Sequence, residues 1–183
     1  DVLSNTDTIG YVGRLDNKVK RIDLIMRSLP LLLKDKPNAR LILVGTGPDE
    51  GFLRSLARDL GIEERVEFRG AVPDVFDVMK EYGCLVLPSA FEGLPMVIIE
   101  ALSLGIPVIA TGVGDVKDLV LDNVTGRIIR DDSPESLARL IGEVLNDPAL
   151  AARTRETGPA LVRENYSRES FRENITALYE SLL

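Results

Sequence analysis

The chain has 183 residues, of which 45% are hydrophobic and 28% charged, and its formal net charge is −7. These values are typical of one soluble globular domain with a sizeable core, and the negative charge argues against general nucleic-acid binding. The absence of histidine excludes Ser-His-Asp and Cys-His catalysis and every histidine-containing metal site.

Short apolar segments alternate with longer amphipathic ones. Strands are predicted at 8–13, 40–45, 66–70, 84–89, 107–111 and 125–130, and helices at 21–35, 49–61, 73–83, 95–105 and 115–122. Further helices are predicted at 133–147, 148–166 and 167–183. This alternation predicts an α/β fold, a doubly wound parallel six-stranded sheet with helices on both faces and a helical tail at 149–183.

Two features bear on location. The longest segment with few charges, 93–114, contains glycines, prolines and a glutamate, so it does not predict a membrane span, and the first ten residues show no secretory signal. The single cysteine, Cys84, lies in an apolar run and cannot form an internal disulfide. We expect a small core residue in a reducing, cytoplasmic protein.

Ligands of doubly wound sheets bind where strands end and loops enter helices, so the loop after the fourth strand is of interest. A helix beginning at Pro95 would leave the amides of Leu94, Met96 and Val97 free at its positive end, which suits phosphate. Gly93 leaves room for a ligand to approach the backbone. The sequence therefore predicts an anion site in this loop.

Glu92 and Glu100 flank this predicted anion site, with seven residues between them. Glu100 is the only ionisable residue from 93 to 114. A carboxylate only accepts hydrogen bonds, and the paired hydroxyls of a ribose or hexose are natural donors to it. A phosphate with a sugar on either side describes a nucleoside-diphosphate sugar. The alternative is that Glu100 is a solvated position on a half-exposed helix.

Other loops carry weaker signals. Gly13 ends the first strand, and the basic residues Arg14, Lys18, Lys20 and Arg21 follow; these residues alone leave open whether they bind an anion or are solvated. The glycines of GTGPDEG (45–51) are explained by a tight turn with Pro48 opening a helix. TGVGDV (111–116) fits either a ligand contact or a simple turn. Ser133 is the predicted cap of the helix that follows it.

Together these loops resemble the C-terminal domain of retaining glycosyltransferases of family 4, which have the GT-B fold. The resemblance follows the chain in order, through YVGRLDNKVKRIDLI, LILVGTGP, VEFRGAVPDV, CLVLPSAFEGLPMVIIEALSLGIPVIAT and TGRII. The most specific element is the glutamate pair, Glu92 and Glu100.

The resemblance implies a role for each matching residue. Arg14 and Lys20 would hold the donor diphosphate, Glu92 would contact the donor sugar, and Glu100 would bind the ribose. Catalysis is thus assigned to Arg14, Lys20 and Glu92. Ala71 and Val72 would lie near the base. The other implied donor contacts are Gly13, Gly93, Leu94, Pro95, Met96 and Val97. Transfer would retain anomeric configuration without a metal or cofactor, through transition-state electrostatics.

The sequence also departs from the family. Lys20-Arg21 stands one position later than the family's Lys-Gly, so Lys18 or Arg21 could share the phosphate role. Gly93-Leu94-Pro95 replaces Gly-Phe-Gly, as in some relatives that build surface polysaccharides. Gly114-Asp115 and Asp118 replace Gly-Gly and a glutamate, which leaves the sugar open.

The family carries an N-terminal acceptor-binding domain that this chain lacks. We expect residues 1–183 to be a single donor-binding domain that binds UDP or GDP sugars and transfers poorly alone. The predicted partners are the nucleotide sugar and the acceptor domain. Nothing in the chain indicates nucleic-acid or membrane binding, although the missing domain could bring it to the inner membrane. The alternatives are a sugar-nucleotide epimerase, a phosphorylase relative and a non-catalytic nucleotide-sugar-binding or interaction module.

Overall fold

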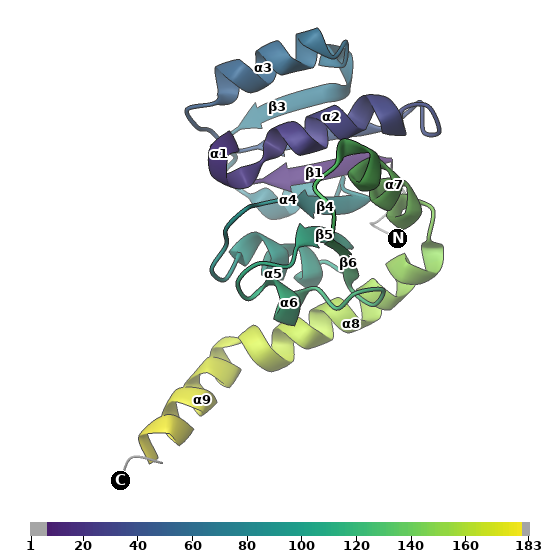
Figure 1. The fold of residues 1–183 in the computed structure, drawn as a ribbon. Coiled ribbons are helices and arrows are strands. Elements are labelled where there is room, and N and C mark those ends of the chain that lie inside the picture. The colour runs from purple at the N-terminus through teal and green to yellow at the C-terminus, as the bar shows by residue number, and fades with distance from the viewer. Residues whose placement is uncertain (1–6, 181–183) are drawn as a thin grey trace.

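A parallel sheet with strand order β3-β2-β1-β4-β5-β6 forms the centre of the molecule (Figure 1). The computed structural model describes residues 7–180, apart from the side chain of Asn174. The strands are β1 (Thr8–Val12), β2 (Arg40–Val44), β3 (Val66–Gly70), β4 (Cys84–Leu87), β5 (Val108–Thr111) and β6 (Gly126–Ile129). Every neighbouring pair is parallel, which confirms the predicted sheet.

Helices cover both faces of the sheet, as predicted. They are α1 (Asn17–Lys20), α2 (Ile22–Leu32), α3 (Glu50–Asp59), α4 (Val75–Met79), α5 (Met96–Ser103), α6 (Val116–Leu119), α7 (Pro134–Leu145), α8 (Pro148–Tyr166) and α9 (Arg168–Glu180), with a 3₁₀ turn η1 (Glu63–Arg65). Helix α2 packs against α3 and α7, whereas α5 packs against α4, α6 and α8.

The helices form where the sequence supplies an apolar face and a cap. Residues Ile22, Ile25, Met26 and Leu29 of α2 are buried at the three- and four-residue spacing of one helical face. The side chain of Ser133 accepts a hydrogen bond from the Ser136 amide at the start of α7, as predicted. Cys84 is buried in β4, and burial raises the pKa of its thiol to about 12, so its predicted place in the core is confirmed.

Several helix boundaries differ from the prediction. The helix expected at 21–35 is α2 (Ile22–Leu32), and an unpredicted short helix, α1 (Asn17–Lys20), precedes it; the left-handed backbone of Arg21 separates the two. Helix α5 begins at Met96, since Pro95 is extended with ψ 101° and precedes the helix instead of opening it. Helix α3 begins at Glu50, so the prediction that Pro48 opens it was wrong. A proline close to a helix start thus marks the boundary within one or two residues.

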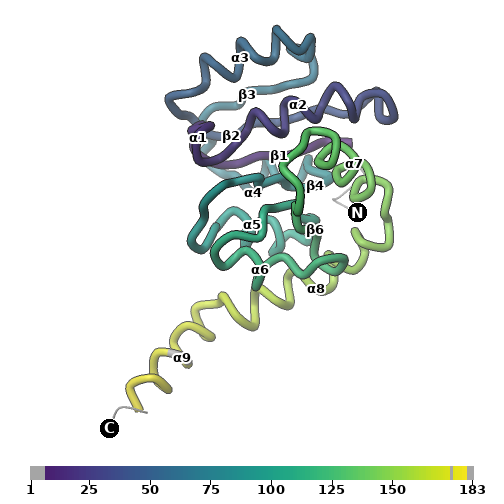
Figure 2. The backbone as a smooth tube through the Cα atoms, viewed as in Figure 1, coloured from purple at the N-terminus to yellow at the C-terminus, as the bar shows by residue number. Residues whose placement is uncertain are grey.

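The C-terminal helical tail is confirmed. Helix α8 crosses α5 closely at Gly158, where a Cβ would lie 2.6 Å from the carbonyl oxygen of Leu102. Helix α9 then leads away from the sheet (Figure 2). Its apolar residues Phe171, Leu178 and Tyr179 are exposed. The last three residues of the predicted helix lie outside the described residues. No helix within residues 7–180 is both long and apolar enough to cross a membrane.

The strand order places the loops of interest together. The chain builds β1, β2 and β3 in one direction and then returns to place β4 on the other side of β1. Loops that leave β1 and β4 therefore diverge to opposite faces and open a crevice at the carboxyl edge, which is where doubly wound sheets bind ligands. Both loops carry residues singled out from the sequence.

Candidate functional site

Three contacts join the segment after β1 to the loop after β4. Three successive residues after β1, Val19 to Arg21, each contact a residue between 88 and 92. The amide of Ala90 donates to the carbonyl oxygen of Val19 at 2.8 Å. The ammonium of Lys20 lies 2.7 Å from a carboxylate oxygen of Glu92. The Nε of Arg21 donates to the carbonyl oxygen of Pro88 at 2.6 Å. The structure thus brings Lys20 and Glu92 together, although 72 positions separate them.

We use the name switch-point site for Gly13, Arg14, Lys20, Glu92, Gly93, Leu94, Pro95, Met96, Val97 and Glu100. Its ion pair is shielded from solvent, because the side chains of Lys20 and Glu92 are 23% and 10% exposed. An ion pair of this kind presents both a cation for a phosphate and a hydrogen-bond acceptor for a hydroxyl.

The backbone of Arg14 is held in place by a hydrogen bond from a buried side chain of β1. The hydroxyl of the buried Tyr11 donates to the carbonyl oxygen of Arg14 at 2.9 Å. Burial, and secondarily the carboxylates of Glu92 and Asp16, raises the pKa of Tyr11, which keeps the phenol a neutral donor. The guanidinium of Arg14 is exposed and has no hydrogen-bond or ion-pair partner among residues 7–180. Arg14 is therefore available to a ligand.

The backbone from Gly93 to Val97 is also available. The amides of Gly93, Leu94, Met96 and Val97 donate no hydrogen bond to any described residue. Nothing lies within 4 Å of the position that a Cβ on Gly93 would take. The first amides of α5 lie at its positive end and are free to donate hydrogen bonds to an anion, which is the kind of site that the sequence predicts here.

The loop after β5 supports Glu92 and Gly93 from the other side. The amide of Asp115 donates to the carbonyl oxygen of Gly93 at 3.2 Å. Gly114 has a φ of 54°, and a Cβ there would lie 2.2 Å from the carbonyl oxygen of Glu92. The glycine is thus required both by its left-handed backbone and by this close approach. Of the two interpretations of TGVGDV, the described contacts fit a structural turn.

Glu100 lies within α5, half-buried, and its carboxylate has no hydrogen-bond or ion-pair partner in the described part of the chain. Burial raises the pKa of this carboxyl group above its ordinary value. A half-buried carboxylate with no partner costs stability. It is neither fully solvated nor satisfied by the protein.

Ala71 and Val72 follow β3, on the far side of β2 from β1. Ala71 is exposed and Val72 is half-buried. The loop is linked to the switch-point site through Gly45, whose amide donates to the carbonyl oxygen of Gly70 at 2.7 Å. Gly45 has a φ of 126°, and a Cβ there would lie 2.0 Å from the carbonyl oxygen of Gly13. The glycines of GTGPDEG therefore serve a tight turn, in line with the structural interpretation.

Sequence reasoning missed Tyr11. The sequence predicts it only as a strand residue, and no pattern shows that its hydroxyl donates to the carbonyl oxygen of Arg14. Arg21 was considered for the phosphate role together with Lys18. The structure leaves Lys18 exposed but gives the Arg21 guanidinium three protein partners, Pro88, Thr111 and Asp132.

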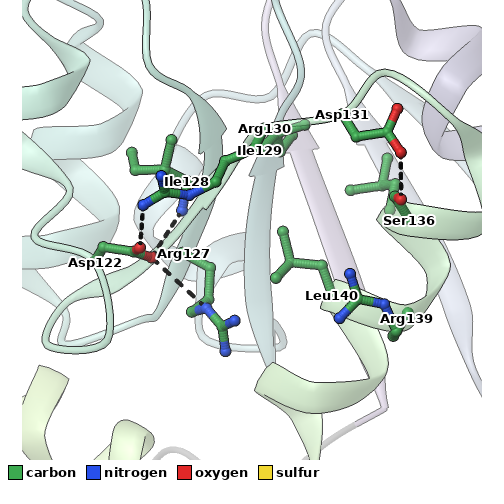
Figure 3. Close-up of a pocket in the computed structure, with 10 residues that line it drawn as sticks. Asp122, Arg127, Ile128, Ile129, Arg130, Asp131, Ser136, Arg139 and Leu140 are labelled. Atoms are coloured by element: carbon green, nitrogen blue, oxygen red, sulfur yellow. Dashed lines mark hydrogen bonds and ion pairs between the residues drawn. The ribbon is translucent and has the colours of Figure 1, made fainter.

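A separate cavity of about 120 Å³ lies between β6 and α7 (Figure 3). Its charged residues all have protein partners: Asp122 pairs with Arg127 and Arg130, Asp131 accepts from the hydroxyl of Ser136, and Arg139 pairs with Glu143 outside the cavity. This cavity is not at the carboxyl edge between β1 and β4, and its charges are already satisfied. Among residues 7–180, no group of three or more histidine, cysteine, aspartate or glutamate side chains could hold a metal ion.

The structure is a doubly wound α/β domain with cationic and amide groups at the carboxyl ends of its strands. The chain belongs to the glycosyl transferases of group 1, whose family description matches residues 3–161.

Relatives and solved structures agree with this family. The chain is 30% identical to the lipopolysaccharide core biosynthesis mannosyltransferase LpcC of Rhizobium leguminosarum over 180 residues, 96% of this chain and 51% of the relative. It is 32% identical to an uncharacterized glycosyltransferase of Haemophilus influenzae, over 91% of this chain and 47% of that protein. The chain thus spans about half the length of these relatives.

The fold is of the GT-B type seen in solved neighbours. Anabaena Alr3699/HepE in complex with UDP aligns with a TM-score of 0.87 and 24% identity, over 97% of this chain and 49% of that one. The C-terminal domain of a group 1 glycosyl transferase, LpcC from Francisella tularensis, aligns with a TM-score of 0.76 and 22% identity, over 88% of this chain and 86% of that one. At these identities the likeness supports the fold alone.

Proposed function

We propose that this chain is the donor-binding domain of a retaining family 4 glycosyltransferase, which binds a nucleoside-diphosphate sugar at the switch-point site. The observation that carries the proposal is the Lys20–Glu92 ion pair beside the unpaired amides at the start of α5. That arrangement offers positive groups for a diphosphate next to a carboxylate for sugar hydroxyls.

The roles follow from where the groups lie. Arg14 and Lys20 bind the diphosphate together with the amides of Leu94, Met96 and Val97. Glu92 accepts hydrogen bonds from hydroxyls of the donor sugar, and Glu100 accepts them from the ribose. Gly13 and Gly93 allow the ligand to approach the backbone, Pro95 orients the start of α5, and Ala71 and Val72 lie toward the base.

The chemistry is stabilisation of charge. As the glycosidic bond to the diphosphate breaks, negative charge grows on the leaving phosphate, where Arg14, Lys20 and the α5 amides are already oriented. The oxygen of the acceptor hydroxyl bonds to the anomeric carbon on the face that the phosphate leaves, and the departing phosphate oxygen takes the hydroxyl proton, which gives retention. These groups supply the positive charge that a metal supplies elsewhere, so we propose that neither metal nor cofactor is needed.

The relatives suggest the substrate class. They include a lipopolysaccharide core mannosyltransferase and a GDP-mannose-dependent phosphatidylinositol monomannoside mannosyltransferase, and the HepE structure contains UDP. We propose a UDP or GDP sugar as donor and a role in polysaccharide or glycolipid synthesis. The setting would be cytoplasmic, with any membrane contact made through an acceptor domain.

Transfer should require that second domain. The chain matches 51% of LpcC and 49% of HepE, so it spans about half of each of these proteins. We therefore expect the 183-residue chain to bind UDP or GDP but to transfer sugar poorly or not at all. Release of UDP from a UDP-sugar and an acceptor glycan measures this; multiple turnover by the chain alone would contradict it.

Replacing Glu100 with glutamine should change binding and stability in opposite directions. Glutamine replaces the charged two-oxygen acceptor with a neutral amide that has one acceptor oxygen and one donor group, which should weaken UDP or GDP binding about tenfold, or about 1.4 kcal/mol. Since the folded-state pKa of Glu100 is raised, its ionisation costs stability as the pH rises through that pKa, and nothing below the unfolded value. The variant should therefore be more stable at neutral pH and equal to the native chain in acid.

Calorimetric titration with UDP, GDP and ADP, with and without EDTA, and urea melts at several pH values test this prediction. Glu64→Gln is a matched control, because Glu64 is exposed in η1. If the Glu100→Gln chain bound UDP or GDP as tightly as the native chain, Glu100 would not be part of the binding site. Weaker binding together with lower stability would instead indicate a structural role.

A further inference from the structure

Arg21 adopts a backbone conformation that L residues seldom take. It joins α1 to α2 with a φ of 49° and a ψ of 44°. Such left-handed geometry is disfavoured for any residue with a Cβ, and it persists only where the surroundings fix it. Asn123 is the other described non-glycine residue with positive φ, and asparagine tolerates this region far better than arginine does. Something must therefore hold Arg21.

The guanidinium of Arg21 supplies that hold. Its two terminal nitrogens donate to the two carboxylate oxygens of Asp132 at 2.5 and 3.0 Å. One of them also donates to the hydroxyl of Thr111 at 3.3 Å, and Nε donates to the carbonyl oxygen of Pro88 at 2.6 Å. One side chain thus connects the ends of β4 and β5 with the segment between β6 and α7. The bidentate contact fixes the plane of the guanidinium.

The neighbours of Arg21 in sequence are the residues that meet the β4–α5 loop. Val19 accepts the Ala90 amide and Lys20 pairs with Glu92. Helix α1 has no buried residue, so packing of its own side chains does not hold it against the sheet. Its position depends on these contacts and on the Asn17 amide, which donates to a carboxylate oxygen of Asp49 at 2.6 Å, and the Arg21 side chain makes the largest number of them.

We infer that Arg21, oriented by Asp132, is a positioning residue that fixes Lys20 against Glu92 and does not itself bind the donor. The inference rests on the proposed function. The competing possibility is that Arg21 leaves Asp132 and binds the phosphate directly, as Lys20 is proposed to do.

The substitution Asp132→Asn distinguishes these two possibilities, because they predict opposite changes in UDP or GDP affinity. Asp132 is 63% exposed, so the change should leave the core intact. If Arg21 binds phosphate, freeing the guanidinium and removing a negative charge should tighten UDP or GDP binding. If Arg21 positions Lys20, loss of the bidentate contact should weaken binding about tenfold, which corresponds to about 1.4 kcal/mol. The matched control is Glu135→Gln, because Glu135 lies nearby in the first turn of α7, makes no hydrogen bond or ion pair with Arg21 and loses the same charge.

A second measurement does not depend on nucleotide. Hydrogen exchange of the Ala90 amide reports whether α1 stays against the β4–α5 loop, since its acceptor is Val19. Arg21→Gly keeps the left-handed backbone accessible while removing the guanidinium. We expect exchange at Ala90 to accelerate at least about tenfold in Arg21→Gly and in Asp132→Asn, with core amides of β1 unchanged.

The outcomes are distinct. If the native chain binds neither UDP nor GDP, the proposed function fails, and exchange at Ala90 still decides whether Arg21 positions α1. If Arg21→Gly does not fold, Asp132→Asn decides both readouts. Unchanged exchange at Ala90, or binding by Asp132→Asn as tight as or tighter than that of Glu135→Gln, would overturn the inference.

Discussion

Replacing Lys20 with methionine is expected to weaken UDP or GDP binding about a hundredfold, or about 2.7 kcal/mol. The change removes a charge-assisted hydrogen bond to the diphosphate, typically worth about 1.5–3 kcal/mol. It also leaves Glu92, only 10% exposed, without the cation that now lies 2.7 Å away. The unpaired carboxylate would then repel the phosphates. Calorimetric titration of both chains gives the ratio of dissociation constants.

Two further variants make this result specific. Lys18→Met removes an exposed lysine of the same helix, whose ammonium has no partner among the described residues, and should change affinity less than about threefold. Adding Glu92→Gln to Lys20→Met should recover part of the lost affinity, because the repulsion disappears. If Lys18→Met and Lys20→Met lost affinity equally, the lysines would act through general electrostatic attraction of the nucleotide, and Lys20 would make no defined contact with it.

Replacing Gly10 with alanine is expected to destabilise the fold by about 3 kcal/mol, near the upper end for overpacking a core. Gly10 lies in β1, between β2 and β4, and a Cβ there would lie 2.0 Å from two ring atoms of Tyr82. The Tyr82 side chain is 2% exposed, so the ring has no free space into which it can move. Urea denaturation should show a lower midpoint with an unchanged slope.

Gly51→Ala is the matched control for this prediction. Gly51 lies in α3, and nothing lies within 4 Å of the position that its Cβ would take. Alanine there should stabilise the chain by about 0.5 kcal/mol, because it restricts the unfolded chain. Equal effects of the two substitutions would contradict the tight packing of Tyr82 against β1.

The fold was predictable from the sequence because its signals are local. Apolar strand segments and amphipathic helical segments alternate at the lengths that βαβ units require, and the caps and glycines mark the boundaries. The short helix α1 was not predictable. Helix α1 has no buried residue and hence no apolar period, and the left-handed Arg21 is held by Asp132, which lies 111 positions away.

The switch-point site was predictable only in part, for a related reason. Arg14, Lys20, Glu92 and Glu100 were selected by residue type and by position after a strand. The Lys20–Glu92 pair depends on the topology, because it forms only once β1 and β4 are neighbours. The hydrogen bond from the Tyr11 hydroxyl to the Arg14 carbonyl oxygen is local, but no residue pattern marks it. Glu100 was selected because it stands alone among apolar residues, and the structure leaves it half-buried without a partner among residues 7–180.

The most direct test of the proposed donor site is an NMR titration of the ¹⁵N-labelled chain with UDP and with GDP in the presence of EDTA. We predict saturable shifts of the amides of Gly13, Gly93, Leu94 and Val97 with at least one of the two nucleotides, unaffected by the chelator. Shifts confined to the cavity between β6 and α7, or no shifts with either nucleotide, would contradict the account.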